Sequence, residues 1–322
     1  MKNQTKITSI LVSCLVIAAF LVGFTKSYHP NIKEKAPVGV ITYSYRSMPS
    51  KIEDIIKYCK ETGVSDLELM GEPAEIFAGM PENPVYKEGH WIPRNKQTEE
   101  QKAALARYAD DVRAWRENAP MEKFKELRKL LDKNGIRVYA FKPNALNENN
   151  SDAEIEYAME AAKILGAGSV TVELPRNGDH SLRLGKLGEK HKMYIGYHAH
   201  LQATDTAWDE ALAQSPYNSM NLDCGHYIAA GGNNTVESLL ALIKSKNARI
   251  TSMHLKDRKN KENGQANMPW GEGNTPILEV VKLVRDNKYF IPMSIELEYN
   301  IPEGSNAVEE VKKCREYVEK GI

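Results

Sequence analysis

Short apolar runs alternate with helical patterns eight times along the chain, and this alternation restricts the fold more than any other sequence feature. Most runs are nearly continuous in apolar residues, which is typical of parallel strands covered by helices. No change in composition marks a linker between two domains. The pattern predicts an α/β protein with a single (β/α)8 TIM barrel over residues 37–322, and a doubly wound open sheet is the alternative. The predicted strands cover residues 38–45, 65–70, 137–144, 169–175, 192–200, 218–226, 249–258 and 290–299.

The second strand–helix unit is irregular, because residues 71–120 separate its strand from the helix that follows. This stretch contains a part rich in Pro and Gly and a helical segment at residues 99–117. An insertion at this point of a barrel leaves the C-terminal end of a strand. We therefore expect residues 71–120 to lie over the barrel mouth, as a lid or as a contact in a homo-oligomer. Packing on the outside of the barrel is the alternative.

The N-terminus has the pattern of a targeting segment. Lys2 and Lys6 precede an uncharged apolar stretch at residues 7–24, and Lys26 follows it, which is the arrangement of a secretory signal. The stretch is also long enough to span a bilayer, so residues 1–27 are predicted to be a signal peptide or an N-terminal membrane anchor. A lipoprotein signal around Cys14 is a third alternative. We expect an exported protein that is periplasmic or membrane-anchored and faces the periplasm.

Charge and cysteine content exclude two other classes of protein. Lys and Arg together number 43, as do Asp and Glu, so there is no net positive charge to hold nucleic acid. Beyond the N-terminal segment only Cys59, Cys224 and Cys314 remain, too few for a disulfide framework. The fold must therefore be stabilised by its hydrophobic core, and we expect Cys59 and Cys314 to be buried thiols.

Side chains that commonly bind metals gather at the C-terminal ends of the fourth to eighth predicted strands. Residues i and i+2 of a strand point to the same side, so both histidines of the GYHAH motif can face the barrel mouth. Burying unpaired carboxylates is costly unless a cation compensates their charge. The pattern therefore predicts a divalent metal ion. The candidate residues are Glu173, His198, His200, Asp223, His226, His254 and Glu296.

The ordered motifs YHAH, LDCGHYIAAGG, HLKDR, PWGEGNTP and IELEY extend this argument. They resemble those of the xylose isomerase-like TIM-barrel family, the sugar phosphate isomerase/epimerase group, and especially its branch of inosose dehydratases and 3-keto-glycoside lyases. The resemblance covers residues 169–299 and implies a Mn, Mg, Co or Zn ion. It places Asp223, His254 and Glu296 on the family's metal positions. Many relatives have Glu where this chain has His198, and Glu173 is the candidate for the missing fourth ligand.

The implied activity is isomerisation or epimerisation of a sugar or keto-sugar, by proton abstraction next to a carbonyl through a metal-stabilised enediolate. The substrate is expected to be a small sugar or keto-glycoside. The predicted catalytic residues are His198, His200, Glu296 and Lys256, and the predicted substrate-binding residues are His226, Arg258 and Trp270.

Three other functions are compatible with the same residues. The first is a metal-dependent lyase or dehydratase, of the 3-keto-glycoside eliminase or inosose dehydratase type, in which a group leaves after deprotonation. The second is a non-catalytic carbohydrate-binding protein, suggested by the absence of the usual fifth-strand Glu. The third is a metal-dependent endonuclease, which the neutral charge balance argues against.

Overall fold

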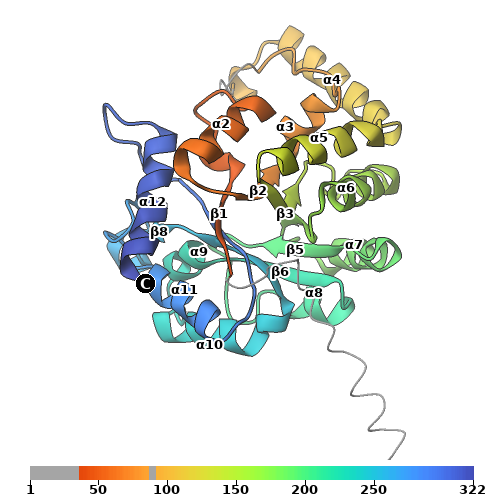
Figure 1. The fold of residues 1–322 in the computed structure, drawn as a ribbon. Helices are drawn as coiled ribbons and strands as arrows, with labels where there is room; N and C mark the ends of the chain where they lie inside the picture. Colours follow the sequence, from red (N-terminus) through yellow and green to blue (C-terminus); the bar gives the residue numbers. More distant parts are fainter. Residues whose placement is uncertain (1–35, 87–91) are drawn as a thin grey trace, which may run out of the picture.

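Eight parallel strands close into a barrel in the computed structural model, which describes residues 36–86 and 92–322 (Figure 1). The order around the barrel is β1-β10-β7-β6-β5-β4-β3-β2, so the barrel strands follow one another in chain order. This confirms the predicted (β/α)8 TIM barrel. The predicted signal or anchor at residues 1–27 lies outside the described residues. The barrel strands are β1 (Val38–Ile41), β2 (Asp66–Met70), β3 (Arg137–Lys142), β4 (Ser169–Glu173), β5 (Tyr194–His198), β6 (Asn218–Asp223), β7 (Ile250–Leu255) and β10 (Met293–Ile295).

All eight predicted strands are present, but several end earlier than their apolar pattern indicates. The run at residues 218–226 stops being a strand at Asp223, where α9 (Cys224–Ala230) begins. Asp223 Oδ1 accepts a hydrogen bond of 2.7 Å from the backbone N–H of His226 and so caps this helix. The early start of α9 holds the Asp223 side chain at the barrel mouth.

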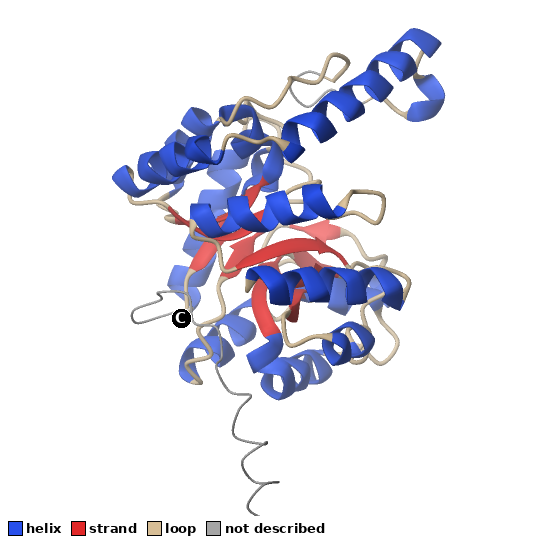
Figure 2. Ribbon diagram, turned by 90° about the vertical axis from the view of Figure 1, so that its right-hand side faces the viewer, coloured by secondary structure: helices blue, strands red, loops and turns tan. Residues whose placement is uncertain are grey.

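Helices surround the barrel on all sides and bury apolar residues against its outer surface (Figure 2). Their ends follow sequence signals. Gly63, with φ of 70°, ends α2 (Ile52–Thr62) in a left-handed conformation, and Ser151 with Glu154 forms the predicted capping box. The remaining helices are α3 (Gly71–Phe77), α4 (Glu99–Glu117), α5 (Met121–Lys133), α6 (Asp152–Leu165), α7 (Gly178–His191), α8 (Asp209–Gln214), α10 (Val236–Lys246), α11 (Ile277–Asp286) and α12 (Ala307–Gly321).

The register of neighbouring strands brings the predicted ligands to one end of the barrel. Glu173 is paired with His198 between β4 and β5, and His198 with Asn221 between β5 and β6. Asp223 is paired with His254 between β6 and β7. Because the strands are parallel, their C-terminal ends meet at the same rim. The rim therefore collects the side chains that the sequence places at separate strand ends.

A buried ion network attaches the insertion at residues 71–120 to the barrel helices. Arg116 of α4 is 7% exposed, and its Nε donates to Glu75 Oε1 of α3 at 3.0 Å. Its Nη1 donates to Glu154 Oε1 of α6 at 3.4 Å. Helix α4 thus packs beside α6, at the edge of the barrel nearest β2 and β3 (Figure 1). That the insertion covers the mouth stays a prediction.

A loop after β7 is shaped by one carboxylate. Asp257 accepts hydrogen bonds from the backbone N–H groups of Gly271, Gly273 and Thr275, at 2.9, 2.8 and 3.1 Å. A side chain at position 273 would collide with Asp257, so glycine is required there. Two short antiparallel strands, β8 (Asp257–Arg258) and β9 (Asn267–Met268), complete the loop.

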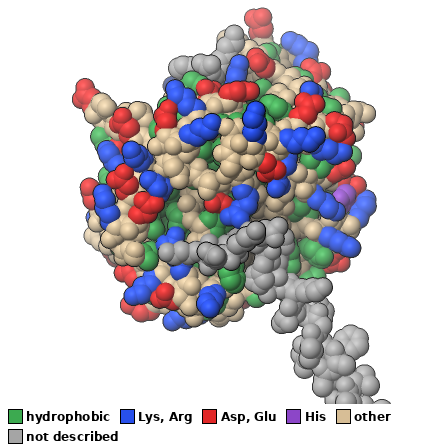
Figure 3. All heavy atoms as spheres, in the orientation of Figure 1, with side chains coloured by type: hydrophobic (Ala, Val, Ile, Leu, Met, Phe, Trp, Pro, Cys, Tyr) green, Lys and Arg blue, Asp and Glu red, His purple; other side chains and the backbone are tan. Residues whose placement is uncertain are grey.

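The distribution of surface charge and the state of the cysteines agree with what the sequence composition indicates. On the face shown in Figure 3, basic and acidic side chains are intermingled. Cys59, Cys224 and Cys314 are buried free thiols, which confirms the prediction for Cys59 and Cys314. Over residues 36–86 and 92–322, no helix is both long enough and apolar enough to span a membrane.

Candidate active site

Four side chains from four strand ends converge at the barrel mouth, and we call them the buried donor group: His198, Asp223, His254 and Glu296. Each is at most 6% exposed. His254 Nδ1 lies 3.1 Å from Glu296 Oε2 and 3.8 Å from Asp223 Oδ2, and His198 Nε2 lies 3.8 Å from Asp223 Oδ2. The structure therefore brings together the three residues on the family's metal positions, with His198 beside them.

A chain of hydrogen bonds orients His198. Asn221 Nδ2 donates to Glu68 and, at 2.8 Å, to Ser252 Oγ, so Asn221 Oδ1 is the acceptor facing His198 Nδ1 at 3.0 Å. The proton of His198 is therefore on Nδ1, and Nε2 presents a lone pair. Burial, with Lys142 and His254 nearby, lowers the pKa of His198 well below its ordinary value and keeps the ring neutral.

Asp223 Oδ2 is a buried oxygen whose charge is only partly compensated. It accepts no hydrogen bond from the described residues, although Lys256 Nζ forms an ion pair with it at 3.0 Å. The lone pair of His198 Nε2 faces it, so two acceptors meet without a proton between them. Burial raises the pKa of Asp223 to about 6, because the nearby Lys256 offsets the cost of a buried charge only in part. An additional cation at this point would satisfy both acceptors.

His254 lies between two carboxylates. Its Nε2 is 2.8 Å from Glu68 Oε2, and its Nδ1 is 3.1 Å from Glu296 Oε2. Burial alone would lower the pKa of His254, but Glu68 and Glu296 outweigh burial and raise it to about 10. The ring can keep a proton on Nε2, hydrogen-bonded to Glu68, while Nδ1 becomes free to bind a metal. A carboxylate behind a histidine ligand is the usual second partner at metal sites.

Lys256 offsets part of the negative charge of the site. It is 2% exposed, and its Nζ lies 3.0 Å from Asp223 Oδ2 and 2.7 Å from both Glu296 Oε2 and Glu298 Oε2. Burial would lower the pKa of Lys256, but these carboxylates raise it above its ordinary value. Two of the three acids also belong to the buried donor group, so Lys256 supplies part of the compensating charge.

The buried donor group fits a divalent metal ion. Two ligand atoms about 2.1 Å from one ion are separated by roughly 3.0–4.2 Å, and the distances of 3.1 and 3.8 Å lie in this range. Carboxylate oxygens and imidazole nitrogens suit Mg, Mn or Zn. Asp223 Oδ2, which accepts no hydrogen bond from the described residues and has only an ion pair with Lys256, favours such an ion over a site closed by hydrogen bonds.

Glu173 and His200 form a separate pair on the rim. Glu173 is 49% exposed, and its Oε1 accepts from Lys142 Nζ at 3.0 Å. Its Oε2 faces His200 Nε2 at 3.5 Å, and the side chain of His200 is 54% exposed. In the described part of the chain no hydrogen bond or ion pair joins Glu173 to the buried donor group. Its role as a metal ligand stays a prediction, and His198 is the fourth donor that the geometry offers.

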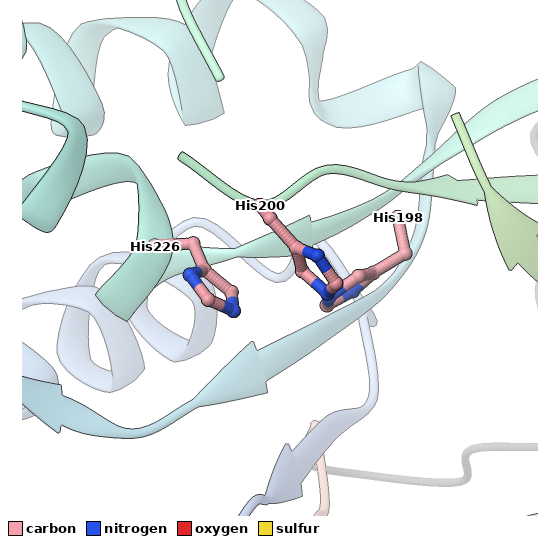
Figure 4. A group of neighbouring side chains, drawn as sticks. All are labelled: His198, His200 and His226. Atoms are coloured by element: carbon pink, nitrogen blue, oxygen red, sulfur yellow. The ribbon is translucent and has the colours of Figure 1, made fainter. Parts of the chain in front are cut away.

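The remaining predicted residues lie in different surroundings. His226 of α9 stands beside His200, with ring centroids 4.5 Å apart, and Figure 4 shows it near His200, in the loop after β5, and His198, at the end of β5. Burial and Lys256 lower the pKa of His226 to about 2. Arg258 Nη1 is 2.5 Å from His226 Nδ1. Trp270 instead packs edge-to-face on Tyr317 of α12, with centroids 6.1 Å apart, so its place in a substrate site stays a prediction.

Glu68 is the central residue that sequence reasoning missed. It lies within β2, is fully buried, and accepts hydrogen bonds from Thr171 at 2.8 Å, Ser294 at 3.1 Å and Asn221. The available signal was a charge between Leu67 and Leu69 in the middle of a predicted strand, which is costly to bury without partners. Glu68 therefore orients both histidines of the buried donor group, His254 directly and His198 through Asn221.

Replacing Glu68 by Gln tests this orienting role. The substitution keeps the volume of the side chain but removes the charge that holds the Nε2 proton of His254. We expect the affinity for Mn²⁺ or Zn²⁺ to fall by about 10–100-fold, as measured by competition with a chelating dye. Glu279→Gln, at an exposed position on α11, is the matched control. Unchanged affinity in Glu68→Gln would contradict the role of Glu68.

Carboxylates and histidines at the C-terminal ends of the strands of a (β/α)8 barrel are typical of barrel enzymes, whose active sites lie at the barrel mouth. The profile of the xylose isomerase-like TIM barrel matches residues 101–317, and the chain belongs to that family. No curated protein matches the sequence at a significant level.

Solved structures share the fold at low sequence identity. The probable 3-DHS dehydratase AsbF from Bacillus anthracis has a TM-score of 0.59 and 16% identity, over 88% of this chain and 98% of that one. The 3-keto-D-glucoside 4-epimerase YcjR from E. coli has a TM-score of 0.57 and 12% identity, over 89% and 100%. A xylose isomerase-like TIM barrel protein from Mycobacterium smegmatis in complex with magnesium has a TM-score of 0.53 and 11% identity, over 91% and 98%.

Proposed function

We propose that this protein is a divalent-metal-dependent isomerase or epimerase that removes a proton next to the carbonyl of a sugar or keto-sugar. One observation carries the proposal: His198, Asp223 and His254 bring ligand atoms within 4.8 Å of one another, with Glu296 Oε2 3.1 Å from His254 Nδ1, and Asp223 Oδ2 among them has the ion pair with Lys256 but accepts no hydrogen bond from the described residues. Membership of the xylose isomerase-like family supports it, as does the likeness to a structure named as a 3-keto-D-glucoside 4-epimerase.

The proposed ligands are Asp223, His254, Glu296 and His198. A divalent ion bound there supplies Lewis-acid stabilisation of the negative charge that develops on a carbonyl oxygen during deprotonation. The chain's own residues prepare the site for this charge. Glu68 and Asn221 hold the histidine rings in place, and Lys256 adds a positive charge that Asp223, Glu296 and Glu298 fix in position.

His200 is the residue that we propose to carry the proton. It lies at the open mouth, its ring centroid is 4.9 Å from that of His198, and it is half exposed, so a substrate can reach it. Glu173 faces its Nε2 and can orient the ring. The buried imidazoles are less suited to this task, because His254 is held by two carboxylates and His198 Nδ1 is held by Asn221.

The proposed location follows from residues 1–27 alone. Their basic start and apolar stretch support export to the periplasm, as a free or membrane-anchored protein. A substrate met outside the cytoplasm would be a free or oxidised glycoside rather than a phosphorylated sugar.

The experiment that tests the proposed function is proton exchange. The protein, dialysed against EDTA and then supplied with Mn²⁺, is incubated in D2O with ketohexoses and with a 3-keto-glucoside, and the sugars are analysed by mass spectrometry. Incorporation of deuterium without cleavage, only when the metal is present, supports an isomerase or epimerase. Release of the aglycone or of water assigns the lyase or dehydratase alternative. Absence of exchange and of cleavage with every substrate contradicts metal-assisted deprotonation.

His200→Gln separates the proton carrier from the metal site. We expect the rate of deuterium incorporation to fall by about 100-fold while bound Mn²⁺ is unchanged, because removal of a general base affects the chemical step. The matched control is His191→Gln on α7, where the histidine faces Glu156 away from the barrel mouth. Exchange at the unaltered rate in His200→Gln would assign the proton transfer to another residue.

A further inference from the structure

Hydrogen bonds to the backbone of Gln265 hold Arg258 beside His226. Its side chain is 8% exposed, and its Nε and Nη2 donate to the carbonyl oxygen of Gln265 at 3.2 and 2.6 Å. The side chain of Gln265 in turn donates to the carbonyl of Ala229 at the end of α9. The guanidinium thus spans from the loop after β8 to the helix that carries His226.

His226 is fixed from its other side. Its backbone N–H donates to Asp223 Oδ1, and Gly225 before it packs against Lys256 so closely that a Cβ would lie 2.6 Å from the Lys256 carbonyl oxygen. The start of α9 therefore has no freedom to move away from the mouth. In this position the ring presents Nδ1 to Arg258 and turns Nε2 toward the buried donor group, 4.0 Å from Asp223 Oδ2.

The contact of 2.5 Å between Arg258 Nη1 and His226 Nδ1 determines where the histidine proton lies. A guanidinium offers only N–H donors and keeps its charge in proteins, so Nδ1 must be the acceptor. A neutral imidazole with its lone pair on Nδ1 carries its proton on Nε2. The atom of His226 that faces the mouth is therefore a hydrogen-bond donor.

We propose that Arg258 is a positioning residue that locks His226 as the Nε2–H tautomer, so that His226 donates a hydrogen bond to an uncharged hydroxyl or carbonyl oxygen of the substrate. The identity of the accepting oxygen rests on the proposed function, whereas the tautomer does not. Arg258 acts through His226 because its own donors face His226 Nδ1 and the Gln265 carbonyl.

The same lock excludes His226 from metal binding. His198, His200 and His226 place ligand atoms within 4.8 Å of one another, which by distance alone is a second candidate metal site. His198 has only Nε2 free, and that atom also belongs to the buried donor group. With Arg258 on Nδ1 and a proton on Nε2, His226 has no lone pair to offer. The geometry therefore points to one metal ion, held by the buried donor group.

Nitrogen NMR of the histidine ring tests the lock directly. Protein with ¹⁵N-labelled histidine is compared with Arg258→Gln and Arg258→Lys, and His226→Gln assigns the signals. In the unaltered protein we expect His226 to show a protonated Nε2 and an unprotonated Nδ1, both unchanged when one equivalent of Zn²⁺ is added. Arg258→Gln should lose this pattern, and Arg258→Lys, which keeps a charged donor, should retain it in part.

Kinetics supply the second readout. We expect Arg258→Gln to lower kcat/KM by about tenfold with one Mn²⁺ still bound, because an outer partner of a site residue is lost. Arg176→Gln, at an exposed position of the same rim, is the control. An unprotonated Nε2 on His226 in the unaltered protein, or loss of the Nε2 proton on adding Zn²⁺, would overturn the inference at any level of activity. Failure to turn over any sugar would instead count against the proposed function, and the NMR pattern would still decide the tautomer.

Discussion

Asp223→Asn is expected to abolish the binding of one equivalent of metal ion and to lower the rate of substrate deprotonation by about 1,000-fold. The substitution leaves Oδ1 in place to cap α9, so the helix start and the volume of the side chain are kept. It replaces Oδ2, the buried oxygen that forms an ion pair with Lys256 but accepts no hydrogen bond from the described residues, by an NH2 group that cannot bind a cation. Lewis-acid stabilisation contributes several kcal/mol, and about 4 kcal/mol corresponds to three orders of magnitude.

The measurement pairs elemental analysis of the purified variant with the deuterium exchange assay. Asp209→Asn is the matched control, since Asp209 is 50% exposed on α8 and is paired with Lys246 far from the buried donor group. It should keep both metal and activity. If Asp223→Asn retained one equivalent of Mn²⁺ and full exchange, the metal site would have to be assigned to other residues.

The architecture was predictable because the period of the apolar residues depends only on local geometry. Parallel strands buried on both faces need continuous apolar runs, and the amphipathic helices between them need an apolar stripe. These requirements located all eight barrel strands. They did not locate strand ends, because a cap such as Asp223 depends on a hydrogen bond that the apolar pattern does not encode.

The site was predictable where its residues lie at strand ends and less so where they lie deeper. His198, Asp223, His254 and Glu296 all follow apolar runs, so barrel topology alone places them at one rim. Glu68 lies one layer below, and its partners come from β4, β6, β7 and β10. Only the register of these four strands shows that it supports the histidines.

Glu173 lies at a strand end but is not part of the buried donor group. Thr171, two residues earlier on β4, points into the barrel and donates to Glu68. Glu173 points to the same side but one layer higher, where the rim is open to solvent and Lys142 neutralises it. The level of a side chain along the barrel axis therefore matters as much as its direction, and a sequence supplies only the direction.

The ion network of the insertion was also beyond the sequence, because Arg116 is separated from Glu75 and Glu154 by 41 and 38 residues. All three side chains are almost fully buried, and Tyr157 adds a hydrogen bond to Glu75. Removing the guanidinium leaves two buried carboxylates without their closest cation. Leaving buried charges unpaired lowers the free energy of unfolding by far more than the intact ion pair contributes to it.

We therefore expect Arg116→Met to lower the free energy of unfolding by about 3–5 kcal/mol, measured by urea denaturation. Arg113→Met is a closely matched control: the residue lies one turn earlier on α4, its side chain is 52% exposed, and its Nε is 3.8 Å from the same Glu154. Solvent screens this pair, so the control should lose no more than about 1 kcal/mol. Equal losses in the two variants would show that the insertion is held by the general packing of α4, whereas the expected difference assigns its attachment to the buried network around Arg116.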